Sequence, residues 1–158
     1  MTRVGEGAFI TELTDANGEK LRTIGGEYGV TTGRPRRCGW FDAVSARYSV
    51  LVGGLSEVAL TKLDVLDNFD EIKVATAYKN KLTGEIISKY PTNVYTHGDF
   101  EPVYETHKGW NTNITNCKTY DELPLEAKNY LKRLEELLGI KITIISVGPD
   151  REQTIFVD

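Results

Sequence analysis

The segment 125–145 constrains the fold most, because it predicts a helix that leads directly into a strand. Within 125–138 leucines recur on one helical face, Pro124 suits the first turn and Gly139 ends the helix. Residues 140–145 are then almost all β-branched, which is typical of a buried strand. We therefore expect a mixed α/β fold with α+β character.

Weaker patterns elsewhere predict a second main helix and a small mixed sheet. Apolar residues in 40–52 recur at helical spacing. Residues 71–78 alternate charged and apolar side chains, as in a half-exposed strand, and we expect them to pair with 85–88 across a turn at Gly84. Further strands are expected at 57–60, at 153–157 and, as an edge strand, at 102–106.

Length and charge exclude several classes of protein. The 158 residues suffice for a hydrophobic core, and we expect one domain. The formal net charge is -4, so a broad basic surface for nucleic acid is not expected. No apolar run approaches the roughly 20 residues that cross a bilayer, and the first residues lack the apolar stretch of a secretory signal. We therefore expect a cytoplasmic protein with neither a membrane nor a nucleic-acid partner.

Residues 1–37 are glycine-rich and polar, with a turn expected at Asp15–Gly18, so this part should be mostly loop. Its most informative stretch is Gly29–Arg37, which holds a glycine turn, two threonines and three arginines. Hydroxyls and glycine backbone amides can donate to an anion, and guanidinium groups match carboxylate or phosphate. The helix expected at 40–52 adds its positive end. The stretch predicts a site for a small anion; a solvated basic turn or a short nucleic-acid patch is the alternative.

Two later segments suggest a pocket for guanine. Thr61–Asp64 follows the strand expected at 57–60, and Ser146–Pro149 follows the strand expected at 140–145. An Asp carboxylate can accept from both the ring N–H and the amine of guanine, and backbone N–H groups can donate to its carbonyl. Open α/β sheets bind ligands at the carboxyl ends of their strands. Ordinary turns after a strand explain the same residues, and spacing does not show whether the two segments are adjacent.

The other reactive side chains do not form a recognisable centre. Cys38 and Cys117 lack metal-type spacing, and a buried thiol is the simpler interpretation of Cys38. His97 and His107 have no evident acidic partner. We expect no protein-only metal site, because Mg²⁺ would be held largely by the phosphates of a ligand. The carboxylates that suggested a metal cluster are Asp64, Asp67 and Asp70, which are interleaved with Leu66 and Phe69.

Several blocks of the sequence resemble the adenylosuccinate synthetase family of GTP-dependent ligases. The resemblance spans nearly the whole chain, and its most specific block is Glu27–Asp42. The other blocks are Thr2–Gly7, Leu60–Asp67, Pro102–Glu105, Gly109–Trp110 and Ile145–Arg151. The resemblance implies the C-terminal part of a larger nucleotide-binding α/β enzyme of purine biosynthesis. That enzyme joins IMP and L-aspartate to form adenylosuccinate on the route to AMP, with GTP as co-substrate and Mg²⁺.

The resemblance also implies a role for individual residues. The stretch from Val30 to Arg36 resembles the loop that closes over L-aspartate, with Arg34 also reaching IMP and Arg36 reaching GTP. The loop residues are Val30, Thr31, Thr32, Gly33, Arg34, Pro35 and Arg36. The guanine-binding residues are expected to be Lys62, Leu63, Asp64, Ser146, Val147 and Gly148.

One part of the family pattern is missing from this chain. No Gly-x-x-x-x-Gly-Lys phosphate loop is present, and the catalytic Asp and His of the family are expected in the missing N-terminal part. We therefore expect no catalytic residue here and no activity from the chain alone. Residues 1–52 would carry the aspartate loop and its helix, and 53–158 the guanine-recognition segments. The parent enzyme is expected to be a homodimer; a non-catalytic nucleotide-binding, anion-binding or dimerisation module is the alternative.

Overall fold

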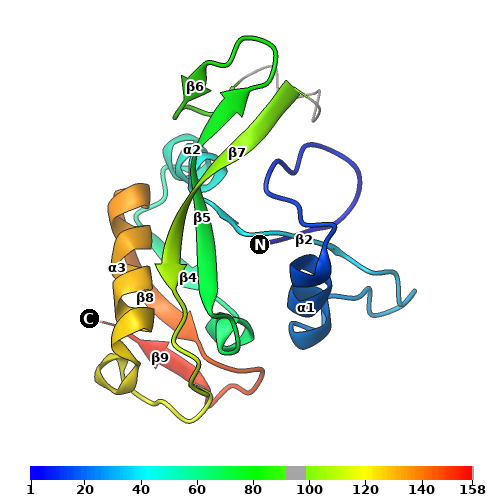
Figure 1. The fold of residues 1–158 in the computed structure, drawn as a ribbon. Coiled ribbons are helices and arrows are strands. Elements are labelled where there is room, and N and C mark those ends of the chain that lie inside the picture. Colours follow the sequence, from blue (N-terminus) through cyan, green and yellow to red (C-terminus); the bar gives the residue numbers. More distant parts are fainter. Residues whose placement is uncertain (92–98, 158) are drawn as a thin grey trace. The chain divides into compact units, whose positions relative to one another are not determined.

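The computed structural model describes residues 1–91 and 99–157 (Figure 1). The chain forms two compact units, one of residues 1–48 and 73–105, the other of residues 49–72 and 106–158. The helices are α1 (Ala16–Ile24), α2 (Ala43–Gly53) and α3 (Leu125–Leu138), with the short 3-10 helices η1 (Leu63–Leu66) and η3 (Tyr120–Glu122). The strands are β1 (Thr2–Arg3), β2 (Arg37–Cys38), β3 (Phe41–Asp42), β4 (Glu57–Leu60), β5 (Glu71–Asn80), β6 (Ile86–Ile87), β7 (Phe100–Lys108), β8 (Lys141–Ser146) and β9 (Thr154–Phe156).

The first unit is built on β5. Strand β3 lies parallel to β5, β6 lies antiparallel to it, and β7 also pairs with it. Tyr78 of β5 faces Ile87 of β6, so the pairing predicted across the turn at Gly84 is confirmed. Strand β5 is more buried than its alternating pattern predicted, because it is the central strand of this sheet. Tyr78 packs with Val44 and Phe100 in the core of the unit.

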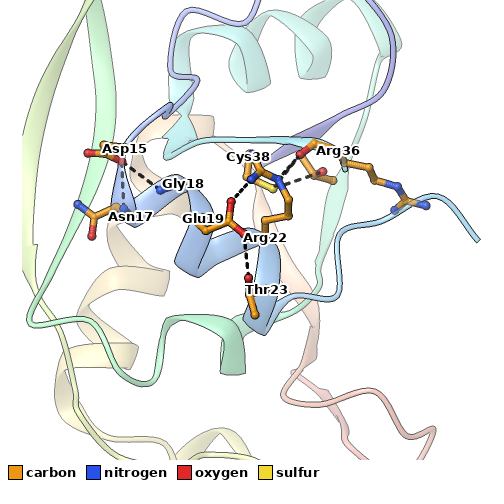
Figure 2. A network of polar contacts seen from close by, with 9 residues as sticks. Asp15, Asn17, Gly18, Glu19, Arg22, Thr23, Arg36 and Cys38 are labelled. Atoms are coloured by element: carbon orange, nitrogen blue, oxygen red, sulfur yellow. Dashed lines mark hydrogen bonds and ion pairs between the residues drawn. The ribbon is translucent and has the colours of Figure 1, made fainter. Parts of the chain in front are cut away.

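Helix α1 corrects the expectation that residues 1–37 are mostly loop. The turn expected at Asp15–Gly18 is the start of this helix, where the Asp15 carboxylate accepts from the N–H groups of Asn17 and Gly18 (Figure 2). Gly18 lies inside the helix, where it packs closely against the preceding segment of the chain. A side chain does not fit there, because an added Cβ would come within 2.2 Å of the Leu13 carbonyl oxygen. The glycine therefore serves close packing, and the turn signal was misleading.

Helix α2 begins three residues later than predicted. Phe41 and Asp42 pair with β5 as strand β3, and the Asp42 carboxylate then accepts from the Ser45 N–H at the start of the helix. Trp40, which was expected in the helix, is buried just before β3.

The second unit is a three-stranded sheet with α3 against it. Strands β4 and β8 are parallel, and β9 is antiparallel to β8. Helix α3 contacts β8 and has the predicted bounds, with Gly139 in the left-handed conformation at its end. Strand β4 also has its predicted bounds, and β8 and β9 differ from prediction by one residue at each end. The largest fully buried side chains of this unit include Leu63, Ile114, Leu131, Leu134, Ile145 and Ile155.

These elements confirm a mixed α/β fold with small mixed sheets. The described residues 1–91 and 99–157 form three α-helices, where two main helices were expected. Strand β7 is longer than the edge strand expected at 102–106. His97 lies outside the described residues. In the ranges 1–91 and 99–157, no helix has both the length and the apolar character to cross a membrane.

Candidate functional site

The stretch predicted to bind an anion forms an exposed loop on a short stem in the first unit. Tyr28 and Pro35 form a β-bridge, and the Arg36 N–H donates to the Glu27 carbonyl at 2.9 Å. Above this stem the Gly29 N–H donates to the Arg34 carbonyl at 2.9 Å. All residues from 30 to 35 are exposed, and Gly33 has a φ of +65°, which favours glycine. The tip therefore presents its polar groups to solvent.

The three arginines of this stretch differ in how far they are already engaged. The Arg37 guanidinium donates to both carboxylate oxygens of Glu12, at 2.9 and 2.5 Å, and to the carbonyls of Gly5 and Gly7. It also lies over the Phe9 ring, 5.6 Å from its centroid. The hydrogen bonds with Glu12 raise the pKa of Arg37 further above its ordinary value. Arg37 therefore stabilises the fold and is not available to a ligand.

Arg36 is only partly engaged, and Arg34 is available. The Arg36 Nη1 group lies 2.9 Å from the Glu27 carboxylate, and its side chain is 32% exposed. The Arg34 side chain is exposed and has no hydrogen bond or ion pair with the part of the chain that the structure describes. The structure thus separates one structural arginine from two that can still reach a ligand, which composition did not predict.

Helix α1 supports the stem of the loop from below (Figure 2). The Arg22 Nε–H donates to the Arg36 carbonyl at 2.9 Å, and Glu19 forms an ion pair with Arg22. The Cys38 thiol is buried beside the same carbonyl, and burial raises its pKa above the ordinary value. A raised pKa disfavours the thiolate, so Cys38 is a packing residue and not an activated nucleophile.

The first predicted guanine segment follows β4 in the second unit. Lys62 adopts a left-handed conformation with φ 60°, and Leu63 is buried at the start of η1. Burial raises the pKa of Asp64, and its own backbone N–H and the Lys62 ammonium offset only part of this. Oxygen Oδ1 of Asp64 is buried without a hydrogen-bond partner among the described residues. An unpaired buried acceptor is costly and is typical of a position that a ligand completes.

The neighbouring carboxylates of Asp67 and Asp70 accept hydrogen bonds within the second unit. The Asp67 carboxylate accepts from the Trp110 indole N–H at 2.7 Å and from the Ile114 N–H at 3.1 Å. Asp70 accepts from the Asn111 side chain at 3.1 Å. In the described ranges 1–91 and 99–157, no group of three or more His, Cys, Asp or Glu side chains is placed to hold a metal ion.

The second predicted guanine segment follows β8 and is supported by Gln153. The Val147 N–H donates to the Gln153 carbonyl at 2.9 Å, so this donor is already used. The Gly148 N–H has no such partner within the described part of the chain. An added Cβ at Gly148 would lie 2.2 Å from the Gln153 side-chain oxygen. Gln153 therefore shapes this turn, and sequence analysis did not identify it.

The pairing of β4 with β8 brings the two guanine segments to one sheet edge. The strands are parallel, and Leu60 near the end of β4 faces Ile145 near the end of β8. Helix η1, which contains Leu63 and Asp64, also contacts β8. The two segments are thus neighbours within the second unit, whereas the anion loop belongs to the first unit.

A cavity of about 140 Å³ lies elsewhere in the first unit. Its lining includes Asp42, whose carboxylate accepts from the buried Tyr78 hydroxyl at 2.6 Å. Burial raises the pKa of Asp42 and that of Tyr78. None of the predicted site residues lines this cavity, and its buried pair stabilises the core.

Comparisons with known proteins show the family to which the chain belongs. The adenylosuccinate synthetase family profile matches residues 1–155. The adenylosuccinate synthetases of Geotalea daltonii and Geobacter sulfurreducens are 55% and 54% identical over 155 and 157 residues, 98% and 99% of this chain. The structure of fully ligated adenylosuccinate synthetase from Plasmodium falciparum superimposes with a TM-score of 0.95 at 44% identity, covering 100% of this chain and 38% of that one. This chain spans 36% of the length of both bacterial relatives. The chain therefore belongs to the adenylosuccinate synthetase family, as the family profile, the sequence identity and the structural match all show.

Proposed function

We propose that this chain supplies the guanine pocket and the aspartate loop of an adenylosuccinate synthetase, the GTP-dependent ligase that joins IMP and L-aspartate. The observation that carries the proposal is Asp64 Oδ1, which is buried without a hydrogen-bond partner among the described residues. Asp64 follows β4, the strand that pairs with β8. A carboxylate in that position can accept from the N1–H and the amine of guanine. Adenine offers neither the N1–H nor an amine at that position, so the pocket favours GTP over ATP.

The remaining guanine contacts follow from the same sheet edge. The Gly148 N–H has no hydrogen-bond partner among the described residues, and it suits the guanine carbonyl. The Lys62 stem can lie along the base plane, since Lys62 is exposed two residues before Asp64. Leu63, Ser146 and Val147 complete the segments, and the buried Leu63 and Val147 side chains hold them in place.

The loop in the first unit would bind the carboxylate substrate. The Thr31 and Thr32 hydroxyls and the Arg34 guanidinium are exposed at its tip, with Val30, Gly33 and Pro35 shaping the turn. We assign Arg34 to both L-aspartate and IMP, and Arg36 to the phosphates of GTP.

In the proposed reaction GTP phosphorylates the 6-oxygen of IMP, and the aspartate amine then displaces phosphate. Arg34 and Arg36 would stabilise the negative charge that develops on the transferred phosphoryl group and hold the carboxylates in place. Mg²⁺, which neutralises phosphate charge, would be held by the phosphates and by the part of the family fold that this chain does not span. Cytoplasmic location and homodimeric assembly remain predictions of the family resemblance.

A chimera tests the proposal. The chain replaces the corresponding 36% of the Geotalea daltonii enzyme, to which it is 55% identical. We expect the chimera to form adenylosuccinate from IMP, aspartate, Mg²⁺ and GTP, with far less product when ATP replaces GTP. The chain alone should form none. A folded chimera without turnover would favour a non-catalytic binding or dimerisation module instead.

A further inference from the structure

Arg36 is held at three points of the first unit before any ligand is present. Its N–H donates to the Glu27 carbonyl at 2.9 Å. Its carbonyl accepts from the Arg22 Nε–H at 2.9 Å (Figure 2). Its guanidinium contacts the Glu27 carboxylate through Nη1 at 2.9 Å. Both the backbone and the guanidinium group of Arg36 are thereby fixed.

Glu27 is suited to hold a partner in place. Its side chain is only 8% exposed, whereas the Arg36 side chain is 32% exposed. A buried carboxylate cannot leave its partner without losing a charged hydrogen bond, so the pair is stronger than a surface ion pair. The anchored partner is thus the acid, and the exposed partner is the arginine.

Only one edge of the guanidinium is occupied. Arginine has five N–H donors, and among the described residues the Arg36 guanidinium uses only its Nη1 donor, toward Glu27. The guanidinium extends away from Arg22 and Cys38 (Figure 2). The donors that remain can form the two parallel hydrogen bonds with which arginine binds a phosphate group.

We propose that Glu27 is a positioning residue that holds Arg36 by one edge and leaves the other edge open for the phosphate groups of the nucleotide. This inference rests on the proposed function of the loop. A fixed guanidinium loses less rotamer entropy on binding than a free one, which favours the bound state. Glu27 does not touch the ligand in this arrangement, so it acts through Arg36.

A competing role for Glu27 predicts the opposite effect of mutation. If Glu27 merely occupied Arg36, its removal would release a guanidinium and strengthen anion binding. Removal of a nearby negative charge would also strengthen it through simple electrostatics. Weaker binding after Glu27→Gln can therefore come only from lost positioning, provided that the variant stays folded.

The test is an NMR titration of the ¹⁵N-labelled chain with tripolyphosphate, which stands in for the triphosphate of GTP. The signals followed are the Arg36 side-chain N–H groups, and thermal unfolding confirms that each variant is folded. We expect the wild-type Arg36 head to give restrained signals that shift with tripolyphosphate. In Glu27→Gln the Arg36 signals should lose this restraint. The Kd for tripolyphosphate should rise roughly three- to tenfold, because Arg36 regains rotamer freedom that binding must then remove.

Two variants serve as controls. Glu12→Gln removes the same charge near the loop but from the partner of Arg37, which is fully engaged, so its Kd should stay unchanged or fall slightly. Glu27→Asp keeps the charge and shortens the side chain, so it should weaken binding as well. It also replaces Glu27→Gln if that variant does not fold.

The outcomes separate the two proposals. A Kd for folded Glu27→Gln and Glu27→Asp that equals or falls below the wild-type value overturns the positioning role and leaves the function of the loop standing. A wild-type Arg36 head that is restrained by Glu27 but does not respond to tripolyphosphate contradicts the proposed function of the loop, and the positioning role fails with it. Freely rotating Arg36 in the wild-type chain overturns the positioning role directly.

Discussion

Leu60 and Ile145 face each other near the carboxyl ends of two parallel strands, β4 and β8. This pairing brings the segments Lys62–Asp64 and Ser146–Gly148 to one edge of the second unit's sheet. Parallel strands place their following loops on the same side, where open α/β sheets bind ligands. The proposed guanine pocket therefore depends on the pairing register of β4 and β8 and on the carboxylate of Asp64.

We expect Asp64→Asn to stabilise the chain at neutral pH. Burial raises the pKa of Asp64 above its ordinary value of 3.8, so the charged form costs stability in the folded state. Because the side chain is half-buried and water screens part of this cost, the gain should be no more than about 0.5–1 kcal/mol. The cost is present above the folded pKa and vanishes as the pH falls below 3.8.

Thermal unfolding at a series of pH values checks this. The advantage of Asp64→Asn should shrink as the solution is acidified, and the exposed Asp150→Asn should show no comparable gain. A less stable Asp64→Asn at neutral pH would mean that the carboxylate is satisfied within the chain.

Trp110→Phe should destabilise the second unit by about 1–3 kcal/mol, because it leaves the buried Asp67 carboxylate without its shorter hydrogen bond. A double-mutant cycle with Asp67→Asn, followed by chemical denaturation, isolates the coupling between the two side chains. Coupling close to zero would show that the indole acts through its bulk alone.

Gly109→Ala should be one of the most damaging small substitutions in the chain. The added Cβ would lie 1.6 Å from the Phe69 carbonyl oxygen, so the backbone of two segments must separate. We expect a loss of more than about 3 kcal/mol or failure to fold, measured by denaturant unfolding.

Gly26→Ala is the matched control for Gly109→Ala. Gly26 has a φ of +59° with nothing within 4 Å of the added Cβ, so only backbone strain of about 1 kcal/mol is expected. Equal effects of the two substitutions would contradict the close contact at Gly109.

Lysine substitutions should separate the structural arginine, Arg37, from Arg34, which is proposed to bind the ligand. Arg37→Lys loses the paired hydrogen bonds to Glu12 and should cost about 1–3 kcal/mol in thermal unfolding. Arg34→Lys should stay within about 0.5 kcal/mol of wild type, because its exposed side chain has no partner among the described residues. The reverse order of effects would exchange the roles of the two residues.

Elements with strong local signals were predictable from sequence. Helix α3 has its predicted bounds because an apolar stripe, a proline start and a glycine end all agree. Strand β4 also has its predicted bounds, because it is a short apolar run of strand length. Helix α1 was missed because Gly18 resembles a turn residue, whereas the close approach of the Leu13 backbone that requires a glycine there is seen only in the folded chain.

The candidate site was only partly visible in the sequence. Asp64 and the arginine-rich loop stand out by residue type, but the engagement of Arg37 by Glu12 and of Arg36 by Glu27 depends on folding. Glu27 and Arg36 flank the Tyr28–Pro35 bridge, which exists only in the folded chain. No local pattern in the sequence distinguishes an arginine that an acid already holds from one that is available, so these differences could not be predicted.

Nucleotide preference of the Asp64→Asn chimera tests the central claim most directly. Xanthine carries a carbonyl where guanine carries its amine, so an Asn amide at position 64 can accept from N1–H and donate to that carbonyl. We predict that Asp64→Asn raises the KM for GTP by about 100-fold or more and makes xanthosine triphosphate the better substrate for adenylosuccinate formation. A chimera that keeps its preference for GTP after this substitution would contradict the assignment of Asp64 as the guanine-reading residue.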